Sequence, residues 1–104
     1  MSILKIKADP MTRNVSINGE HLSPVNSLTF RNHSPDGFNW GYWGSGPAQL
    51  ALAICMTQLD PDDALLCYQD FKQEHVGNWR GPVDLDLDFI AWHQRWLLDQ
   101  KEQR

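Results

Sequence analysis

Hydrophobic and polar residues alternate through the first part of the chain. Isoleucine and leucine alternate with lysine in residues 2–8, and Val15 and Ile17 continue the same pattern within residues 13–18. A period of two residues is typical of strands that bury one face. The turn-forming residues 9–12 lie between the two segments, so we expect the two strands to form a β-hairpin.

Two more segments have the spacing of strands, and Asn18-Gly19 supplies a turn signal before them. Residues 27–31 carry Leu28 and Phe30 two positions apart, which places both side chains on one face. Residues 38–43 place three aromatic rings on one face in the same way: Phe38, Trp40 and Tyr42. The N-terminal half therefore predicts three or four short strands.

The second half of the chain follows a helical pattern instead. Residues 48–56 are apolar on nearly every side except at Gln49, and Pro47 suits the first helical position. A helix without a polar face belongs in the interior of a protein. We therefore expect this helix at the centre of the domain.

Residues 60–63 have the composition of a helix N-terminus and predict a second helix. Residues 60–63 read Asp-Pro-Asp-Asp, which supplies an N-cap, a first-turn proline and two acids that favour a helix N-terminus. This helix should run to about Val76, with Gly77 as its C-cap. The side chains expected to point inward are Ala64, Cys67, Tyr68 and Phe71.

A last helix should begin at a cap formed by Asp86 or Asp88 and give way to a solvated end at residues 99–104. Its buried stripe would consist of Phe89, Trp92 and Trp96. The fold class predicted by these elements is α+β: a small, mainly antiparallel sheet of three to four strands in the N-terminal half, packed by three helices in the C-terminal half. We expect residues 1–104 to form a single domain.

Composition excludes several classes of protein. The 104 residues carry a net charge of −4, which argues against a polybasic surface for nucleic acid or membrane. No apolar run reaches membrane-span length, and residues 1–7 lack the apolar core of a signal peptide. The two cysteines, Cys55 and Cys67, fall on apolar helical segments and are expected as buried, reduced thiols. We expect a cytoplasmic protein without a cofactor.

The Gly44-Ser45-Gly46-Pro47 turn is the main candidate site. A glycine-rich turn ahead of a helix leaves backbone N–H groups unpaired, and the helix dipole favours an anion there. The candidate ligand-binding residues are Trp40, Tyr42, Trp43, Gly44, Ser45, Gly46 and Gln49. The alternative is a purely structural turn, in which Gly46 is the N-cap and Gln49 folds back in half a capping box.

Sharper motifs are excluded by spacing, and no catalytic or metal-binding residue is predicted. Pro47 and Ala48 stand where a phosphate-binding loop needs Lys and Ser or Thr, and Ser45 lacks the glycine spacing of a nucleophile elbow. The acidic residues 84–88 lack the glycine and glutamate of a calcium loop and read as an extended approach to a helix. The four histidines show no ligand-like spacing, and His93 falls beside the last aromatic stripe.

Residues 38–53 read Phe-x-Trp-Gly-Tyr-x-Gly-Ser-Gly-Pro-Ala-Gln-Leu-Ala-Leu-Ala. This pattern is similar to the signature of a family of small uncharacterised proteins found in bacteria, plasmids and phages. The similarity extends to residues 15–19, to residues 68–72 and to the segment around Trp92. Trp43 stands where a small residue is expected, which makes the turn bulkier. The resemblance implies a mobile-element accessory role, such as countering a host defence protein, by analogy alone.

The sequence favours a non-enzymatic binding or interaction module that uses the aromatic, glycine-rich turn. Its partner would be a small anionic ligand or a host protein. The alternatives are an inhibitor of a host defence protein and a small enzyme acting on an anionic or nucleotide substrate. The sequence does not specify an oligomeric state.

Overall fold

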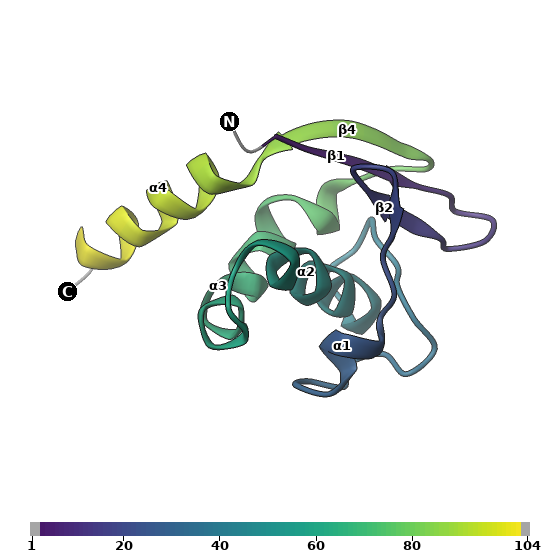
Figure 1. Cartoon of the computed structure of the whole chain (residues 1–104), viewed down its shortest axis with the longest axis horizontal. Coiled ribbons are helices and arrows are strands. Elements are labelled where there is room, and N and C mark those ends of the chain that lie inside the picture. Colours follow the sequence, from purple (N-terminus) through teal and green to yellow (C-terminus); the bar gives the residue numbers. More distant parts are fainter. Residues whose placement is uncertain (1–2, 103–104) are drawn as a thin grey trace.

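A four-stranded antiparallel sheet packs against helices in the computed structural model, which describes residues 3–102 (Figure 1). The strands are β1 (Ile3–Ala8), β2 (Val15–Ile17), β3 (Glu20–His21) and β4 (Val83–Asp88), in the sheet order β3-β2-β1-β4. The helices are α1 (Val25–Leu28), α2 (Ser45–Gln58), α3 (Pro61–Glu74), the 3-10 helix η1 (Val76–Asn78) and α4 (Phe89–Glu102). The predicted α+β class is confirmed. Ser2, predicted in the first strand, lies outside the described residues.

The predicted hairpin between the first two strands is confirmed. Ile6 pairs with Ile17 and Ala8 with Val15, so apolar side chains of both strands share the buried face. The turn from β2 to β3 is made by Asn18 and Gly19, both with positive φ, 54° and 84°. These angles match the tight hairpin turn that Asn-Gly favours.

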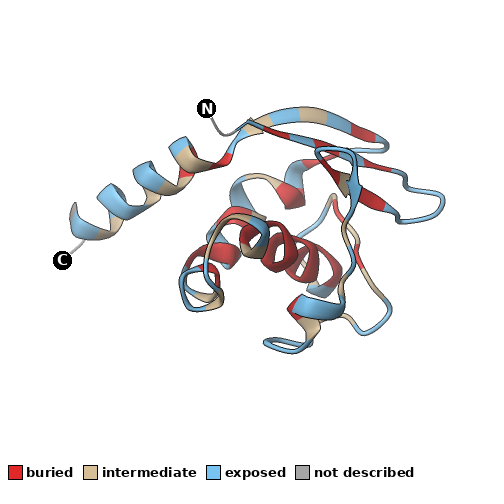
Figure 2. Cartoon of the chain, viewed as in Figure 1, coloured by how far each residue is buried: buried red, intermediate tan, exposed pale blue. Residues whose placement is uncertain are grey.

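Strand β4 comes from the C-terminal half and was not among the predicted strands. It pairs with β1 along its whole length, with Leu4 opposite Leu87 and Ile6 opposite Leu85. The expected extended approach to the last helix is therefore present, but it is a full edge strand of the sheet. Helices lie on one face of this sheet, and the other face is open (Figure 2).

Two of the predicted strands are wrong. Residues 25–28 form the short helix α1, where the Ser27 hydroxyl is buried and donates to the Pro24 carbonyl at 2.8 Å. Residues 38–43 are irregular, although Phe38 and Trp40 are buried as a strand pattern would require. Gly41 within this segment has a φ of +87°, a value that does not occur in a regular strand.

Helix α2 forms the centre of the fold, as predicted. Residues 46–55 are all buried, and Figure 2 shows this helix surrounded by the other elements. Helix α3 packs beside it with the four predicted residues inward: Ala64, Cys67, Tyr68 and Phe71. The thiols of Cys55 and Cys67 are free and buried, also as predicted. Helix α3 ends at Glu74, earlier than expected, and Gly77 lies in η1 instead of capping α3.

Helix α4 follows β4 directly and starts at the predicted cap, where Asp88 Oδ1 accepts from the Ala91 N–H at 3.0 Å. Trp92 packs against Phe71 with ring centroids 5.0 Å apart, and Trp96 Nε1 donates to Asp70 Oδ2 at 2.7 Å. The helix then extends away from the rest of the molecule (Figure 1). It includes residues 99–102 of the predicted solvated end, while residues 103–104 lie outside the described part. No helix within residues 3–102 is long and apolar enough to cross a membrane.

Candidate functional site

Residues 38–46, here called the aromatic turn, lie against the segment that joins α3 to β4. The Gly41 N–H donates to the Val76 carbonyl at 3.1 Å, and Trp40 Nε1 donates to the Gly81 carbonyl at 2.8 Å. A Cβ at Gly41 would lie 2.9 Å from the Trp79 carbonyl oxygen. The close approach and the positive φ both require glycine at position 41.

Tyr42 and Trp43 are the exposed part of the aromatic turn. The two residues are 44% and 55% exposed, respectively. Trp43 is nevertheless fixed in place, because its Nε1 donates to the Gln73 carbonyl at 3.3 Å and its indole lies against Gly77. A Cβ at Gly77 would collide with that indole, so glycine at this position makes room for Trp43.

The glycines of the turn make room for side chains of the same turn. A Cβ at Gly44 would meet the Tyr42 ring, and a Cβ at Gly46 would lie 2.6 Å from the Asn39 Cβ. Gly44 is the N-cap of α2, so the expectation that Gly46 caps the helix is wrong by two residues. Ser45, the first helical residue, is exposed.

Gln49 is fully buried and does not fold back to cap α2. Its Oε1 accepts from the backbone N–H groups of His33, at 2.8 Å, and Ser34, at 3.1 Å. Its Nε2 donates to the Ser27 hydroxyl at 2.8 Å and to the Arg31 carbonyl at 3.0 Å. All four hydrogen-bonding positions of the amide are thus used to hold residues 27–34 on α2.

Two cations lie beside the aromatic turn. Lys72 Nζ is 3.5 Å from the Trp43 carbonyl oxygen. The Arg80 guanidinium donates to the carbonyls of Gly41 at 3.3 Å and Trp79 at 3.1 Å. The side chains of Lys72 and Arg80 and the N-terminus of α2 thus place positive charge beside the aromatic turn, in a chain whose net charge is −4.

The seven candidate residues thus divide into two groups. Tyr42, Trp43, Gly44 and Ser45 lie together at or near the surface, and Trp40, Gly46 and Gln49 are buried behind them. The Ser45 hydroxyl forms no hydrogen bond with a histidine or carboxylate among residues 3–102. The role of the whole set in ligand binding stays a prediction.

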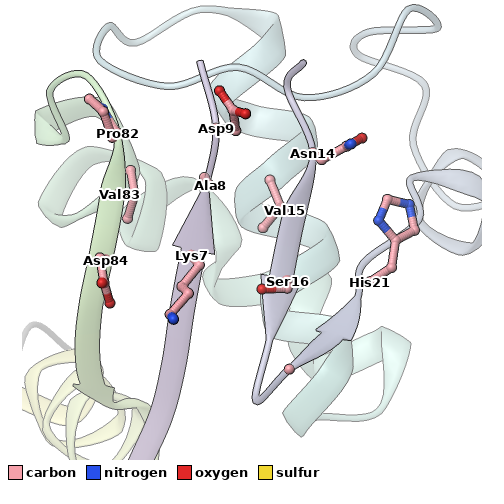
Figure 3. A pocket seen from close by; sticks show the side chains of 11 residues that line it. Lys7, Ala8, Asp9, Asn14, Val15, Ser16, His21, Pro82, Val83 and Asp84 are labelled. Carbon is pink, nitrogen blue, oxygen red and sulfur yellow. The ribbon is translucent and has the colours of Figure 1, made fainter. Parts of the chain in front are cut away.

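The open face of the sheet carries a hollow of about 500 Å³ that sequence reasoning missed (Figure 3). One residue from each strand forms a polar row across it, because Lys7 pairs with both Asp84 and Ser16, and Ser16 pairs with His21. The alternation of apolar and polar residues in β1 predicts that Lys7 points away from the core. The complete row could not be predicted, because it requires β4, which is distant in the sequence, to pair with β1. Among residues 3–102 the Ser16 hydroxyl forms no hydrogen bond with the side chain of Lys7 or His21.

The other three histidines each pack against aromatic side chains. His33 Nε2 and the Tyr68 hydroxyl lie 2.7 Å apart, and burial lowers the pKa of His33 below its ordinary value. Burial also lowers the pKa of His75, which packs on Phe71. His93 lies beside the aromatic stripe of α4, as predicted, with its ring stacked near Phe89 and Trp96. Within the part of the chain that the structure describes, no three His, Cys, Asp or Glu residues are placed to hold a metal ion.

Comparison with known proteins identifies the family. The family of unknown function DUF6166 has a sequence model that matches residues 7–102, so the chain belongs to this family. This confirms the expected membership of a family without an assigned function; the distribution of the signature in bacteria, plasmids and phages stays a prediction. No curated protein and no solved structure matches the chain.

Proposed function

We propose that this chain, as a member of that family, is a non-enzymatic binding module that contacts a partner protein through the aromatic turn. The observation that supports this proposal most directly is the exposure of two adjacent aromatic side chains, Tyr42 and Trp43. Three other tryptophans, Trp40, Trp79 and Trp92, are buried. Large aromatic side chains are typical anchors of protein interfaces, where their burial contributes much of the binding energy.

The fixed position of Trp43 favours recognition. Its hydrogen bond to the Gln73 carbonyl and its contact with Gly77 restrict the ring before any partner arrives. Binding then costs less conformational entropy than it would for a freely rotating side chain. The absence of a side chain at Gly77 allows the Trp43 ring to keep this position.

The charges around the turn indicate the chemistry of the partner. Lys72 donates a hydrogen bond to the carbonyl of residue 43, and Arg80 donates to the carbonyls of residues 41 and 79. Both cations therefore lie at the same end of the molecule as the N-terminus of α2. A complementary surface would carry carboxylates around an apolar recess that receives Trp43. A host defence protein is the partner that the mobile-element resemblance suggests, by analogy alone.

The test is affinity capture from host lysate with three forms of the protein: wild type, Trp43→Ser and Phe30→Ser. Phe30 is a suitable control because it is an aromatic residue with 41% exposure that lies outside the turn. Quantitative mass spectrometry of the captured proteins identifies partners, and isothermal titration with the purified partner measures affinity. We expect Trp43→Ser to weaken binding at least about tenfold, and Phe30→Ser to leave it unchanged.

Two results would contradict the proposal. One is a partner that binds wild type and Trp43→Ser equally well. The other is thermal stabilisation of the protein by a nucleotide or inorganic phosphate that is lost in Ser45→Val, which would favour the small-ligand alternative instead. Thermal unfolding of each variant without a partner checks that the fold is intact.

A further inference from the structure

The two cysteines of the chain meet in the interior of the protein, between α2 and α3. Cys55 lies near the end of α2 and Cys67 in the middle of α3, and these two helices pack side by side (Figure 1). Both residues are fully buried, and their side chains hydrogen-bond to each other. Neither residue belongs to the aromatic turn or lines the hollow on the sheet.

The direction of this hydrogen bond distinguishes the two sulfurs. The Cys67 thiol donates to the Ala64 carbonyl, with 3.9 Å between Sγ and the oxygen, so Cys67 Sγ is left to accept from the Cys55 thiol. The hydrogen bond from Cys55 lowers the pKa of Cys67, although burial and the charges of Asp70 and Asp63 oppose this shift. Burial raises the pKa of Cys55, and the same hydrogen bond adds to the effect. Cys67 therefore forms the thiolate, the nucleophilic state of cysteine, more readily than Cys55 does.

We propose that Cys55 and Cys67 form a redox-active pair, which a hydroperoxide converts to an intramolecular disulfide. The Cys67 thiolate attacks one oxygen of hydrogen peroxide, so that an S–O bond forms, the O–O bond breaks and hydroxide leaves. The Cys55 sulfur then attacks Cys67 Sγ, so that the S–S bond forms, the S–O bond breaks and a second hydroxide leaves. The two hydroxides take up the protons of the two thiols and become water. Each sulfur loses one electron, and the two peroxide oxygens gain these two electrons.

Burial of the pair selects both the oxidant and the product. A bulky disulfide such as oxidised glutathione has no access to a buried sulfur, whereas hydrogen peroxide is close to water in size. Asp63 and Asp70 are exposed and lie about one turn to either side of Cys67 on α3, so a local opening of this helix admits a small oxidant. Cys55 already contacts the oxidised sulfur, which favours a bond within one chain over a bond between two chains.

The disulfide would join α2 to α3 close to residues 59–60, which connect the two helices. A bond that closes a loop restricts the unfolded chain more than the folded chain. Oxidation should therefore stabilise this helix pair, and the midpoint of urea unfolding should be higher for the oxidised protein than for the reduced protein.

The test is oxidation of the full, folded chain by hydrogen peroxide, followed by alkylation with iodoacetamide in denaturant and intact mass spectrometry. Wild type should lose both free thiols together, with a mass decrease of about 2 Da and no added oxygen, and dithiothreitol should restore both. Folded wild type that keeps both thiols, under conditions that oxidise the chain in urea, would overturn the proposal. A disulfide that joins two copies, seen on a non-reducing gel, would also overturn it.

Two matched variants test the role of each sulfur. Cys55→Ser keeps a hydroxyl that can donate to Cys67, and its oxidation should stop at a sulfenic acid on Cys67, which dimedone traps. Cys67→Ser should react at least about tenfold more slowly at Cys55, whose pKa is raised. Equal rates in the two variants would overturn the assignment of Cys67 as the attacking sulfur. Circular dichroism checks that each variant is folded, and the thiol count of wild type tests the pair without any substitution.

Discussion

Lys5 on β1 lies directly opposite Asp86 on β4, with its Nζ 3.8 Å from Oδ1 of the aspartate. In the same register Lys7 is opposite Asp84 on the open face, and Leu4 is opposite Leu87 on the other face. A slip of one residue would turn the leucines to solvent and the aspartates into the core. The Lys–Asp pairs and the leucines therefore specify the same alignment of β4 on β1.

Reversing one charge of this pair should destabilise the sheet. Lys5→Asp places a carboxylate opposite Asp86, and we expect the free energy of unfolding to fall by about 0.5–1 kcal/mol, a small effect because both side chains are exposed. The double variant Lys5→Asp/Asp86→Lys should restore most of the loss. Urea unfolding of wild type, both single variants and the double variant measures the coupling. A coupling of zero at low salt would show that the register depends on the leucines alone.

Local sequence patterns predicted most of the elements but could not reveal how distant elements pair. The hairpin of β1 and β2, the buried α2 and the inward face of α3 each follow from residues close together in the chain. Strand β4 has an alternating pattern of its own in residues 83–88, but its partner β1 lies at the opposite end of the sequence. Only the tertiary fold shows that these two segments are neighbours.

The aromatic turn shows why a short alternating pattern can mislead. Phe38 and Trp40 are buried because they pack in the core, not because they belong to a sheet. Gly41 then redirects the chain, and its N–H bonds to η1 instead of to a neighbouring strand. The role of Gln49 was equally hidden, because its partners in residues 27–34 are distant in the sequence.

Removing the Gln49 amide should destabilise the protein strongly. Gln49→Leu leaves the N–H groups of His33 and Ser34 without their acceptor, and we expect a loss of about 2–4 kcal/mol in the free energy of unfolding. Hydrogen exchange should increase most at these two amides. Gln73→Leu is the control, because the Gln73 side chain is exposed. Equal stability of the two variants would mean that water replaces the lost hydrogen bonds.

A methyl group at Gly46 should also be costly. Its Cβ would lie 2.6 Å from the Asn39 Cβ in a buried position, so the start of α2 or the aromatic turn must shift. We expect Gly46→Ala to lower the free energy of unfolding by about 1–3 kcal/mol, although alanine favours helix more than glycine does. Ser45→Ala at the exposed neighbouring position is the control, with a change within about 0.5 kcal/mol. A stabilised Gly46→Ala would mean that the turn yields without strain.

Burial of two histidines predicts a loss of stability in mild acid. The pKa of His33 is lowered by burial and then by the nearby charges of Lys72 and Arg31. The pKa of His75 is lowered mainly by burial, with Glu74 opposing and Arg95 reinforcing the shift. Both side chains are therefore harder to protonate in the folded chain than in the unfolded chain, where the pKa of histidine is about 6.5.

The sign of the pH effect follows from this difference in proton binding. Between the lowered values and about pH 6.5 the unfolded chain binds more protons, so the free energy of unfolding increases with pH in that window. The stabilisation is fully present above the window and is lost as the pH falls through the folded pKa values. Urea unfolding from about pH 7.5 to about pH 5 should show this loss. His33→Gln/His75→Gln should flatten the profile, whereas His21→Gln, on the exposed side of β3, should retain it. An unchanged slope in the double variant would assign the acid sensitivity to the carboxylates instead.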